Sequence, residues 1–189
     1  MTRYNFDEVT SRQNTGCLKY DFAVQRGRPA DVLPFWVADM DFPIAREIQE
    51  ALLNRCHHAI FGYSESDDAY FAAVHDWYAK HFGWETQQEW LTKTPGVVFA
   101  LAAAVRAFTK PGDSVLINQP VYYPFSEVIK DNKRKLINSP LLLKDGKYSI
   151  DFADLEKKIV EHQVKLYILC SPHNPVGRVW SREELLKLG

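Results

Sequence analysis

Residues 166–177 constrain the fold more than any other stretch, because an apolar strand pattern ends there in a rigid polar turn. The stretch reads Leu-Tyr-Ile-Leu-Cys-Ser-Pro-His-Asn-Pro-Val-Gly. Pro172 and Pro175 restrict the backbone on both sides of Asn174, and Gly177 permits a turn that a Cβ would hinder. Ligands of open α/β sheets collect at the ends of buried strands, so Asn174 is a candidate cofactor contact. The alternative is an ordinary proline-rich exit from a strand.

Strand and helix patterns alternate from Leu91 onward, which is typical of a parallel sheet with crossover helices. A tight turn is expected at Asp145-Gly146, and Ser181 with Glu184 forms the Ser-x-x-Glu capping box of a last helix. The sequence therefore predicts an α/β fold. The expected strands are 114–118, 135–140 and 164–170, and the expected helices are 97–108, 124–132 and 151–161, the last capped by Ser149 or Asp151.

The part before residue 91 has a different pattern. Residues 1–42 have little periodicity and read as an arm or small-domain segment, whereas 44–58 and 67–82 read as amphipathic helices. We expect the second helix to pack its apolar stripe into the core. That stripe consists of Tyr70, Phe71, Val74, Trp77 and Tyr78.

Composition narrows the class of partner. Hydrophobic residues make up 46% of the 189 residues, which is the composition of a globular protein. The formal net charge of -1 gives no reason to expect nucleic acid or an acidic membrane as a partner. Cys17, Cys56 and Cys170 show neither pairing nor metal-ligand spacing, and adjacent His57-His58 reads as a helix end rather than a metal site. No secretory signal or membrane-length apolar run is visible. We expect a cytoplasmic protein with a small-molecule partner and no metal.

Several motifs in order give a family resemblance. Ser171-Pro172-His173-Asn174-Pro175-Val176-Gly177 resembles the Ser-Pro-x-Asn-Pro-x-Gly segment of fold-type I pyridoxal phosphate (PLP) enzymes, the aspartate aminotransferase superfamily. Three more segments resemble the MalY/PatB branch of this superfamily, which contains cystathionine β-lyases. They are Leu33 to Phe42 (Leu-Pro-Phe-Trp-Val-Ala-Asp-Met-Asp-Phe), Phe61-Gly62-Tyr63-Ser64, and Pro120 to Phe125 (Pro-Val-Tyr-Tyr-Pro-Phe). The resemblance implies PLP as cofactor, an arm and small-domain segment over 1–42, and a partial PLP-binding large domain over 43–189.

The resemblance also assigns roles to residues. The turn of Gly96, Val97 and Val98 opens a helix, where free N–H groups and the helix dipole favour an anion, and in the family it holds the cofactor phosphate. The alternative is a helix start that binds nothing, as most do. Tyr122 is expected to stack on the pyridine ring, the alternative being a core tyrosine. Asn174 is expected to bond the phenolic oxygen of PLP.

Tyr63 resembles a tyrosine that reaches across a dimer interface to the phosphate of the partner subunit. The resemblance therefore implies a homodimer with shared sites. The alternative is an exposed loop tyrosine.

The family's Schiff-base lysine, its pyridine-nitrogen aspartate and its carboxylate-binding arginine are all expected beyond Gly189. Lys187 is no substitute, so we assign no catalytic residue within this chain and expect no catalysis from it alone. A parallel sheet with bare edges is also expected to aggregate or remain loose in isolation.

The function implied is a PLP-dependent carbon–sulfur β-lyase that converts an L-cysteine conjugate such as cystathionine to a thiol, pyruvate and ammonia. A PLP-dependent aminotransferase is the alternative, and the residues present do not select between them. A reading from another class is a non-catalytic relative that binds or regulates proteins. A nucleotide-binding domain is disfavoured because the chain lacks G-x-G-x-x-G and the Walker pattern.

Overall fold

The computed structural model describes residues 4–189. The chain forms two compact units, one up to Asp67 and one from Asp68 to Gly189, and each is described by itself. The predicted domain boundary between residues 42 and 43 stays a prediction.

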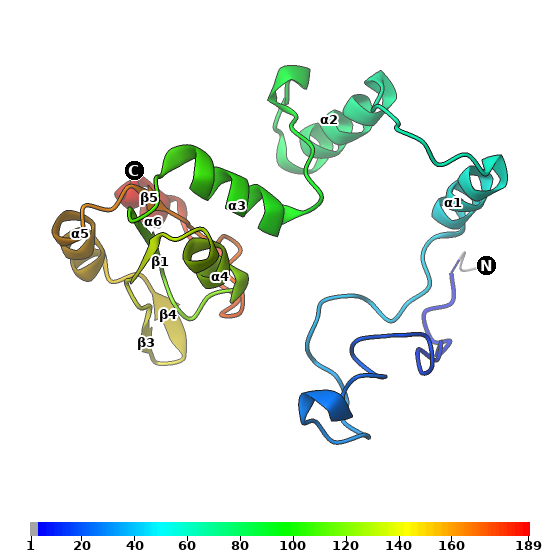
Figure 1. Ribbon diagram of the computed structural model, residues 1–189, viewed down its shortest axis with the longest axis horizontal. Coiled ribbons are helices and arrows are strands. Elements are labelled where there is room, and N and C mark those ends of the chain that lie inside the picture. Colours follow the sequence, from blue (N-terminus) through cyan, green and yellow to red (C-terminus); the bar gives the residue numbers. More distant parts are fainter. Residues whose placement is uncertain (1–3) are drawn as a thin grey trace. The chain divides into compact units, whose positions relative to one another are not determined.

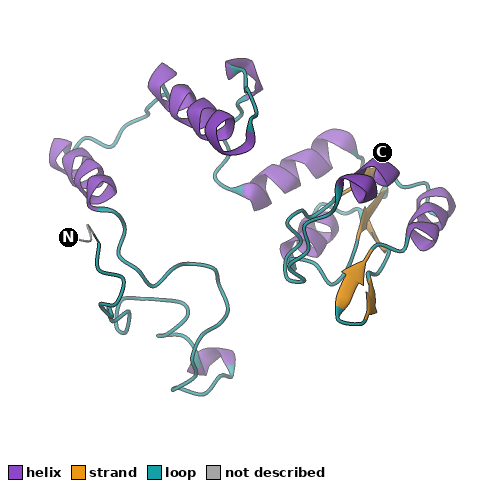
Figure 2. Ribbon diagram, turned by 180° about the vertical axis from the view of Figure 1, so that it is seen from behind, coloured by secondary structure: helices purple, strands orange, loops and turns teal. Residues whose placement is uncertain are grey.

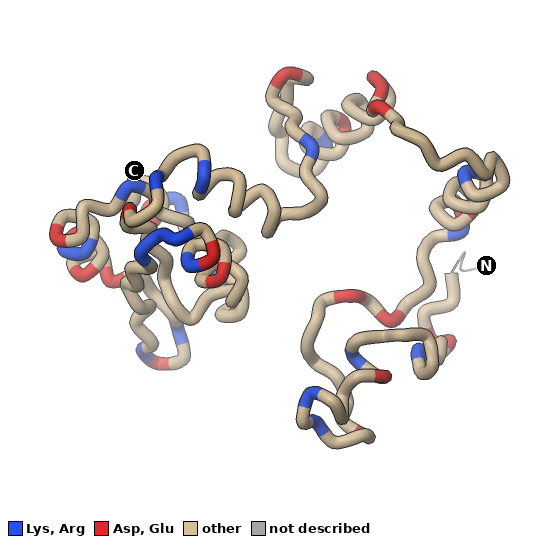
Figure 3. The backbone as a smooth tube through the Cα atoms, in the orientation of Figure 1, with Lys and Arg blue, Asp and Glu red and all other residues tan. Residues whose placement is uncertain are grey.

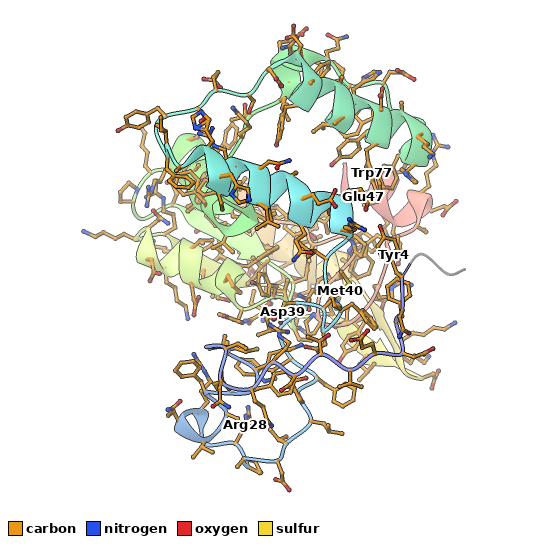
Figure 4. The ribbon with its side chains drawn as sticks, turned by 90° about the vertical axis from the view of Figure 1, so that its right-hand side faces the viewer. Tyr4, Arg28, Asp39, Met40, Glu47 and Trp77 are labelled. Atoms are coloured by element: carbon orange, nitrogen blue, oxygen red, sulfur yellow. The ribbon has the colours of Figure 1, made fainter. Side chains whose placement is uncertain are left out.

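The first unit consists mainly of loops, with a short 3-10 helix η1 (Val24–Arg26) and one helix α1 (Arg46–His58) (Figures 1 and 2). Helix α1 begins two residues after the predicted start and ends as predicted, at the exposed pair His57-His58. The Tyr4 hydroxyl donates to Glu47 Oε2 at 2.7 Å, which attaches the start of the described chain to α1 (Figure 4). None of the residues of α1 is buried, so this helix presents its apolar side chains to solvent.

Two cations and two carboxylates fix the loop structure of the first unit. Arg12 donates to a carboxylate oxygen of Asp39 and, at 2.7 Å, to one of Asp41. The Nζ of Lys19, whose residue is only 4% exposed, donates to the Asp39 carbonyl at 2.9 Å and to Asp41 at 3.3 Å. Chiefly because Arg12 donates to them, the pKa values of Asp39 and Asp41 lie below their usual range. Met40, between the two carboxylates, is exposed (Figure 4).

The second unit contains the sheet and most of the helices (Figure 1). Its elements are α2 (Asp68–Phe82), η2 (Gln88–Trp90), α3 (Val97–Phe108), β1 (Ser114–Ile117), α4 (Pro124–Asp131), β2 (Lys135–Asn138), β3 (Leu142–Lys144), β4 (Lys147–Ser149), α5 (Phe152–Glu161), β5 (Leu166–Tyr167) and α6 (Arg182–Leu188).

Three strands form a parallel sheet in the order β2-β1-β5. Val115 of β1 stands opposite Leu136 of β2 and Leu166 of β5, so β1 is the central strand. Along the chain α4 lies between β1 and β2, and α5 lies between β2 and β5, which confirms the predicted α/β fold with a parallel sheet.

The two faces of the sheet carry separate apolar clusters, because side chains alternate along a strand. Val115 and Ile117 of β1 belong to one cluster, and Leu116 between them belongs to the other. The first cluster includes Val105 of α3 with Phe125, Val128 and Ile129 of α4, and the second includes Leu155 of α5 with Trp180. All four residues of β1 are buried, as expected for a strand covered on both faces.

Local capping matches the prediction in two places. The Asp151 carboxylate accepts from the backbone N–H groups of Ala153 and Asp154 at the start of α5. Ser181 and Glu184 form the reciprocal capping box of α6. Both helices therefore begin where a side chain satisfies their free N–H groups.

Some predicted elements differ from the structure. The last strand is paired only over Leu166–Tyr167, not over 164–170. A hairpin of β3 and β4 was not predicted, although its turn was: Asp145 and Gly146 have φ of 49° and 75°, as a type I′ turn requires.

The predicted burial of the α2 stripe is wrong. No residue of α2 is buried, and Trp77 is 59% exposed. Amphipathic spacing identifies the face that a helix can bury, but burial also requires an opposing surface. Only part of the stripe meets one: Phe71, Val74 and Tyr78 line an apolar hollow with Trp84 and Trp90.

Charged residues of both signs are distributed along the chain in each unit (Figure 3), in keeping with the net charge of -1. None of the described helices has the length and apolar character needed to cross a bilayer. No cluster of three or more His, Cys, Asp or Glu side chains suited to a metal ion is found among residues 4–189.

Truncation of the central strand tests the core. We expect Leu116→Ala to lower the free energy of unfolding by about 3 kcal/mol, because a fully buried leucine leaves a cavity. Urea denaturation measures the change, and Leu186→Ala, at a position 67% exposed on α6, is the matched control. Equal small effects of both substitutions would contradict the assignment of β1 as the core strand.

The ion cluster of the first unit predicts a pH dependence. Asp39 and Asp41 have lowered folded pKa values, so their contribution to stability is present above the unfolded pKa and is lost as the pH falls through the folded values. Carboxyl ¹³C NMR should find both groups titrating below free aspartate. Arg12→Gln should raise both pKa values, whereas Arg46→Gln, which removes a pair on α1, should leave them unchanged.

Candidate functional site

The predicted phosphate turn lies at the start of α3. Gly96 is the N-cap residue, with φ of 136° and ψ of 165°, a conformation that L side chains rarely adopt. A Cβ built there would meet nothing within 4 Å, so the space beside the turn is open. No side chain caps the helix, and Val97 and Val98 are 72% and 38% exposed. The first N–H groups of α3 therefore face an accessible space and can receive an anion.

Tyr122 lies on the loop that follows β1. Its side chain is 38% exposed, and its ring meets the edge of the Phe125 ring at a centroid distance of 6.4 Å and an interplanar angle of 74°. Phe125 is 7% exposed and belongs to the core, whereas Tyr122 stands at the margin of that cluster. The alternative of a core tyrosine is therefore not what the structure shows. An accessible aromatic face is available at this position.

Asn174 lies on the turn that follows β5, which we call the elbow (residues 170–178). The His173 N–H donates to the Arg178 carbonyl at 2.6 Å, and the Gly177 N–H donates to the His173 carbonyl at 2.7 Å. The Asn174 N–H approaches the Cys170 sulfur at 3.4 Å, and Asn174 is exposed. The backbone of the elbow is thus closed by its own hydrogen bonds, while Asn174 is accessible from solvent.

His173 connects the elbow to the loop of Tyr122. Its residue is only 2% exposed, and its Nε2 lies 2.9 Å from the carbonyl oxygen of Pro120. Strands β1 and β5 are parallel neighbours, so their carboxyl ends meet at the same edge of the sheet. The structure thereby brings the loops of Tyr122 and Asn174 together.

The start of α3 belongs to the same region through packing. The cluster on this face of the sheet is contacted by Leu101 of α3, by Val121 next to Tyr122 and by Cys170 at the start of the elbow. A short connection, residues 109–113, joins the end of α3 to the start of β1. All three predicted contact segments are therefore anchored in one apolar cluster.

A buried polar network lies under this edge and was not found by sequence reasoning. The Tyr167 hydroxyl donates to Asn118 Oδ1, and the Asn118 amide donates to the Ser139 carbonyl at 2.8 Å. Burial raises the pKa of Tyr167 to about 12, so the phenol keeps its proton and remains a donor. These bonds tie together the ends of the three strands. Nothing in the local sequence marks them, because their partners are far apart along the chain.

The network continues to α5. The Ser139 hydroxyl donates to Asp154 at 2.7 Å, and the Lys158 Nζ lies 2.9 Å from the same carboxylate oxygen. Hydrogen bonds from Lys158 and then Ser139 hold the pKa of Asp154 below its usual range. Asp154 therefore stays ionised beside the sheet, and its carboxylate carries no proton to donate at neutral pH.

The remaining predicted contact, Tyr63, lies in the first unit. Along the chain it follows α1 and precedes α2, outside any helix or strand. Its side chain is fully exposed. Its role toward a cofactor stays a prediction, as do the cofactor roles of Gly96, Val97, Val98, Tyr122 and Asn174.

Comparison with known proteins places this geometry in a family. The chain is 49% identical over 185 residues to cystathionine beta-lyase PatB of Bacillus subtilis (strain 168) and 32% identical over 183 residues to protein MalY of Escherichia coli (strain K12). These alignments cover 98% and 96% of this chain and 48% and 47% of the relatives. The chain thus spans about half the length of the curated relatives it matches.

A solved structure is similar as well. The crystal structure of cystalysin from Treponema denticola, which contains a pyridoxal 5'-phosphate cofactor, matches with a TM-score of 0.88 and 43% identity, over 98% of this chain and 48% of that one. The model of the family "Aminotransferase class I and II" matches residues 31–189. The chain is therefore a member of the class I and II aminotransferase family and has the fold of the fold-type I PLP enzymes.

Proposed function

We propose that this chain supplies the cofactor-binding part of a PLP-dependent carbon–sulfur β-lyase. The reaction converts an L-cysteine conjugate and water to a thiol, pyruvate and ammonia, so the substrate is a small amino acid. The observation that carries the proposal is the 49% identity, over 98% of the chain, to a cystathionine beta-lyase. The anchoring of the α3 start, the Tyr122 loop and the elbow in one apolar cluster supports it.

The residues present fit the cofactor. The N–H groups that open α3 at Gly96, Val97 and Val98 would hold the phosphate, because they are uncapped and the space beside Gly96 is open. The exposed ring of Tyr122 would lie against the pyridine ring. The exposed amide of Asn174 would donate a hydrogen bond to the phenolic oxygen.

When bound, PLP supplies an electron-accepting ring that stabilises negative charge at the substrate α-carbon. The chain's own residues orient that ring. Tyr122 excludes water from one side of the site, and Asn174 fixes the ring oxygen without adding a charge. The lysine that moves the α-proton is expected beyond Gly189. Lys187 is not assigned this role, since its Nζ lies 4.2 Å from the ring centroid of Phe152 on α5.

The wider setting is also part of the proposal. The functional form is a homodimer in which Tyr63 of one subunit reaches the phosphate of the partner, and the fully exposed ring of Tyr63 supports this. A sedimentation coefficient corresponding to a single chain would contradict it. The three free cysteines support a cytoplasmic location. Residues 1–42 serve as an arm and small-domain segment and 43–189 as part of the large domain.

An aminotransferase is the second candidate, favoured by the name of the family whose model matches residues 31–189. We expect the holoenzyme to form pyruvate, ammonia and a thiol from cystathionine without an added keto acid. Lactate dehydrogenase coupling measures pyruvate, and a thiol reagent measures the second product. Keto-acid formation only when an acceptor is added would assign the aminotransferase. Absence of both reactions in a PLP-loaded protein would favour the non-catalytic, protein-binding reading.

A glycine substitution tests the phosphate turn. Gly96→Ala places a Cβ on a backbone with φ of 136°, so we expect PLP to bind about tenfold more weakly as the turn shifts to relieve strain. Equilibrium dialysis of the holoenzyme measures the dissociation constant. Gly112→Ala is the matched control, because Gly112 has φ of 90° but follows the other end of α3. An equal loss of PLP affinity in both variants would indicate general destabilisation and contradict the assignment.

A further inference from the structure

His173 is a buried polar residue at the centre of the elbow, directly before Asn174. Its Nε2 lies 2.9 Å from the Pro120 carbonyl oxygen, across 53 positions of sequence. A carbonyl has no hydrogen to give, so Nε2 carries the hydrogen and donates it. The bond therefore joins the residue before one predicted cofactor contact to a residue two positions before the other, Tyr122.

The rest of His173 is fixed as well. Its N–H and carbonyl groups both take part in the closing bonds of the elbow, to Arg178 and from Gly177. Its ring stands at 90° to the Trp180 ring, with centroids 5.4 Å apart. The Trp180 indole in turn donates to the Cys170 carbonyl at 2.8 Å. A rotation of the His173 ring would therefore break contacts on both of its sides.

The other ring nitrogen of His173 is buried and has no hydrogen-bond partner, and the same holds for Nε of Arg178. With Nε2 as the donor, Nδ1 is an acceptor, whereas Nε of Arg178 can only donate. The two residues are bridge partners, and both side chains contact Trp180, the Arg178 guanidinium at 4.9 Å from its ring centroid. The two unpaired atoms form no hydrogen bond with each other, so the Nε2 bond to Pro120 is the hydrogen bond that holds the His173 ring.

Arg178 is itself held from outside the elbow. Its guanidinium pairs with Glu184, the residue that closes the capping box of α6. A chain of contacts runs from the start of α6 through Arg178 and His173 to Pro120.

We propose that His173 is a positioning residue that sets the place of Asn174 relative to Tyr122, with its ring fixed by the bond from Nε2 to Pro120 and by the contact with the Trp180 ring. The proposal rests on the proposed function, because it requires Asn174 to contact the cofactor. It assigns no contact between His173 and the cofactor. The effect of His173 passes entirely through the backbone of the elbow.

The test uses the PLP holoenzyme and two readouts besides activity: the absorption spectrum of the bound cofactor as a function of pH, and the dissociation constant of PLP. A donor to the phenolic oxygen alters both. The first variant is His173→Phe, which keeps a ring against Trp180 and removes both nitrogens. The second is His173→Gln, whose amide N–H₂ can still donate to Pro120. His162→Phe, at an exposed histidine at the end of α5, is the matched control.

We expect His173→Phe to shift the spectral transition in the same direction as Asn174→Ala and to weaken PLP binding about tenfold, the effect of losing one placed hydrogen bond. His173→Gln should restore most of the wild-type behaviour. The double variant with Asn174→Ala should show no additional shift, because both changes act on one contact.

Three results would overturn the proposal: a wild-type spectrum in His173→Phe, a shift fully additive with that of Asn174→Ala, or a His173→Gln spectrum as altered as that of Asn174→Ala. If His173→Phe does not fold, the His173→Gln variant decides the matter by the same criteria. An unchanged spectrum in Asn174→Ala itself would instead contradict the proposed role of Asn174, so the two failures are distinguishable.

Discussion

The burial of β1 between two apolar clusters is the constraint on which the rest of the structure depends. Val115 and Ile117 face one cluster and Leu116 faces the other, so helices must cover both sides of the strand. Both other strands of the sheet hydrogen-bond to β1 alone. This arrangement brings the carboxyl ends of β1 and β5 together and leaves their loops, which carry Tyr122 and Asn174, at one edge.

The helices were predictable to within about two residues, because their periodicity and their caps are local properties. Asp151 and Ser181 mark the starts of α5 and α6 in the sequence and in the structure. Strand pairing is not local. The extent of β5 and the pairing of β3 with β4 depend on partners elsewhere in the chain, and the same reason explains why the apolar spacing of α2 identified a face but not its burial.

The candidate site likewise has a part that can be proposed from the sequence and a part that cannot. Gly96, Tyr122 and Asn174 could be selected from sequence because each stands in a motif with a recognisable turn or order. The contacts that hold the motifs could not, because His173 bonds to Pro120 across 53 positions and Tyr167 bonds to Asn118 across 49. His173 occupies a variable position of the Ser-Pro-x-Asn-Pro-x-Gly motif, so the motif assigns it no role. Its burial is a property of the folded chain alone.

The acceptor that His173 uses is a main-chain oxygen, and this has a consequence for how the region can vary. A tether to a backbone carbonyl does not depend on the identity of the side chain at the receiving position. The aromatic group two positions farther along, Tyr122, can therefore be exchanged during evolution or protein engineering while the elbow keeps its attachment. The side chain at position 122 and the anchorage of its loop are separable traits in this scaffold.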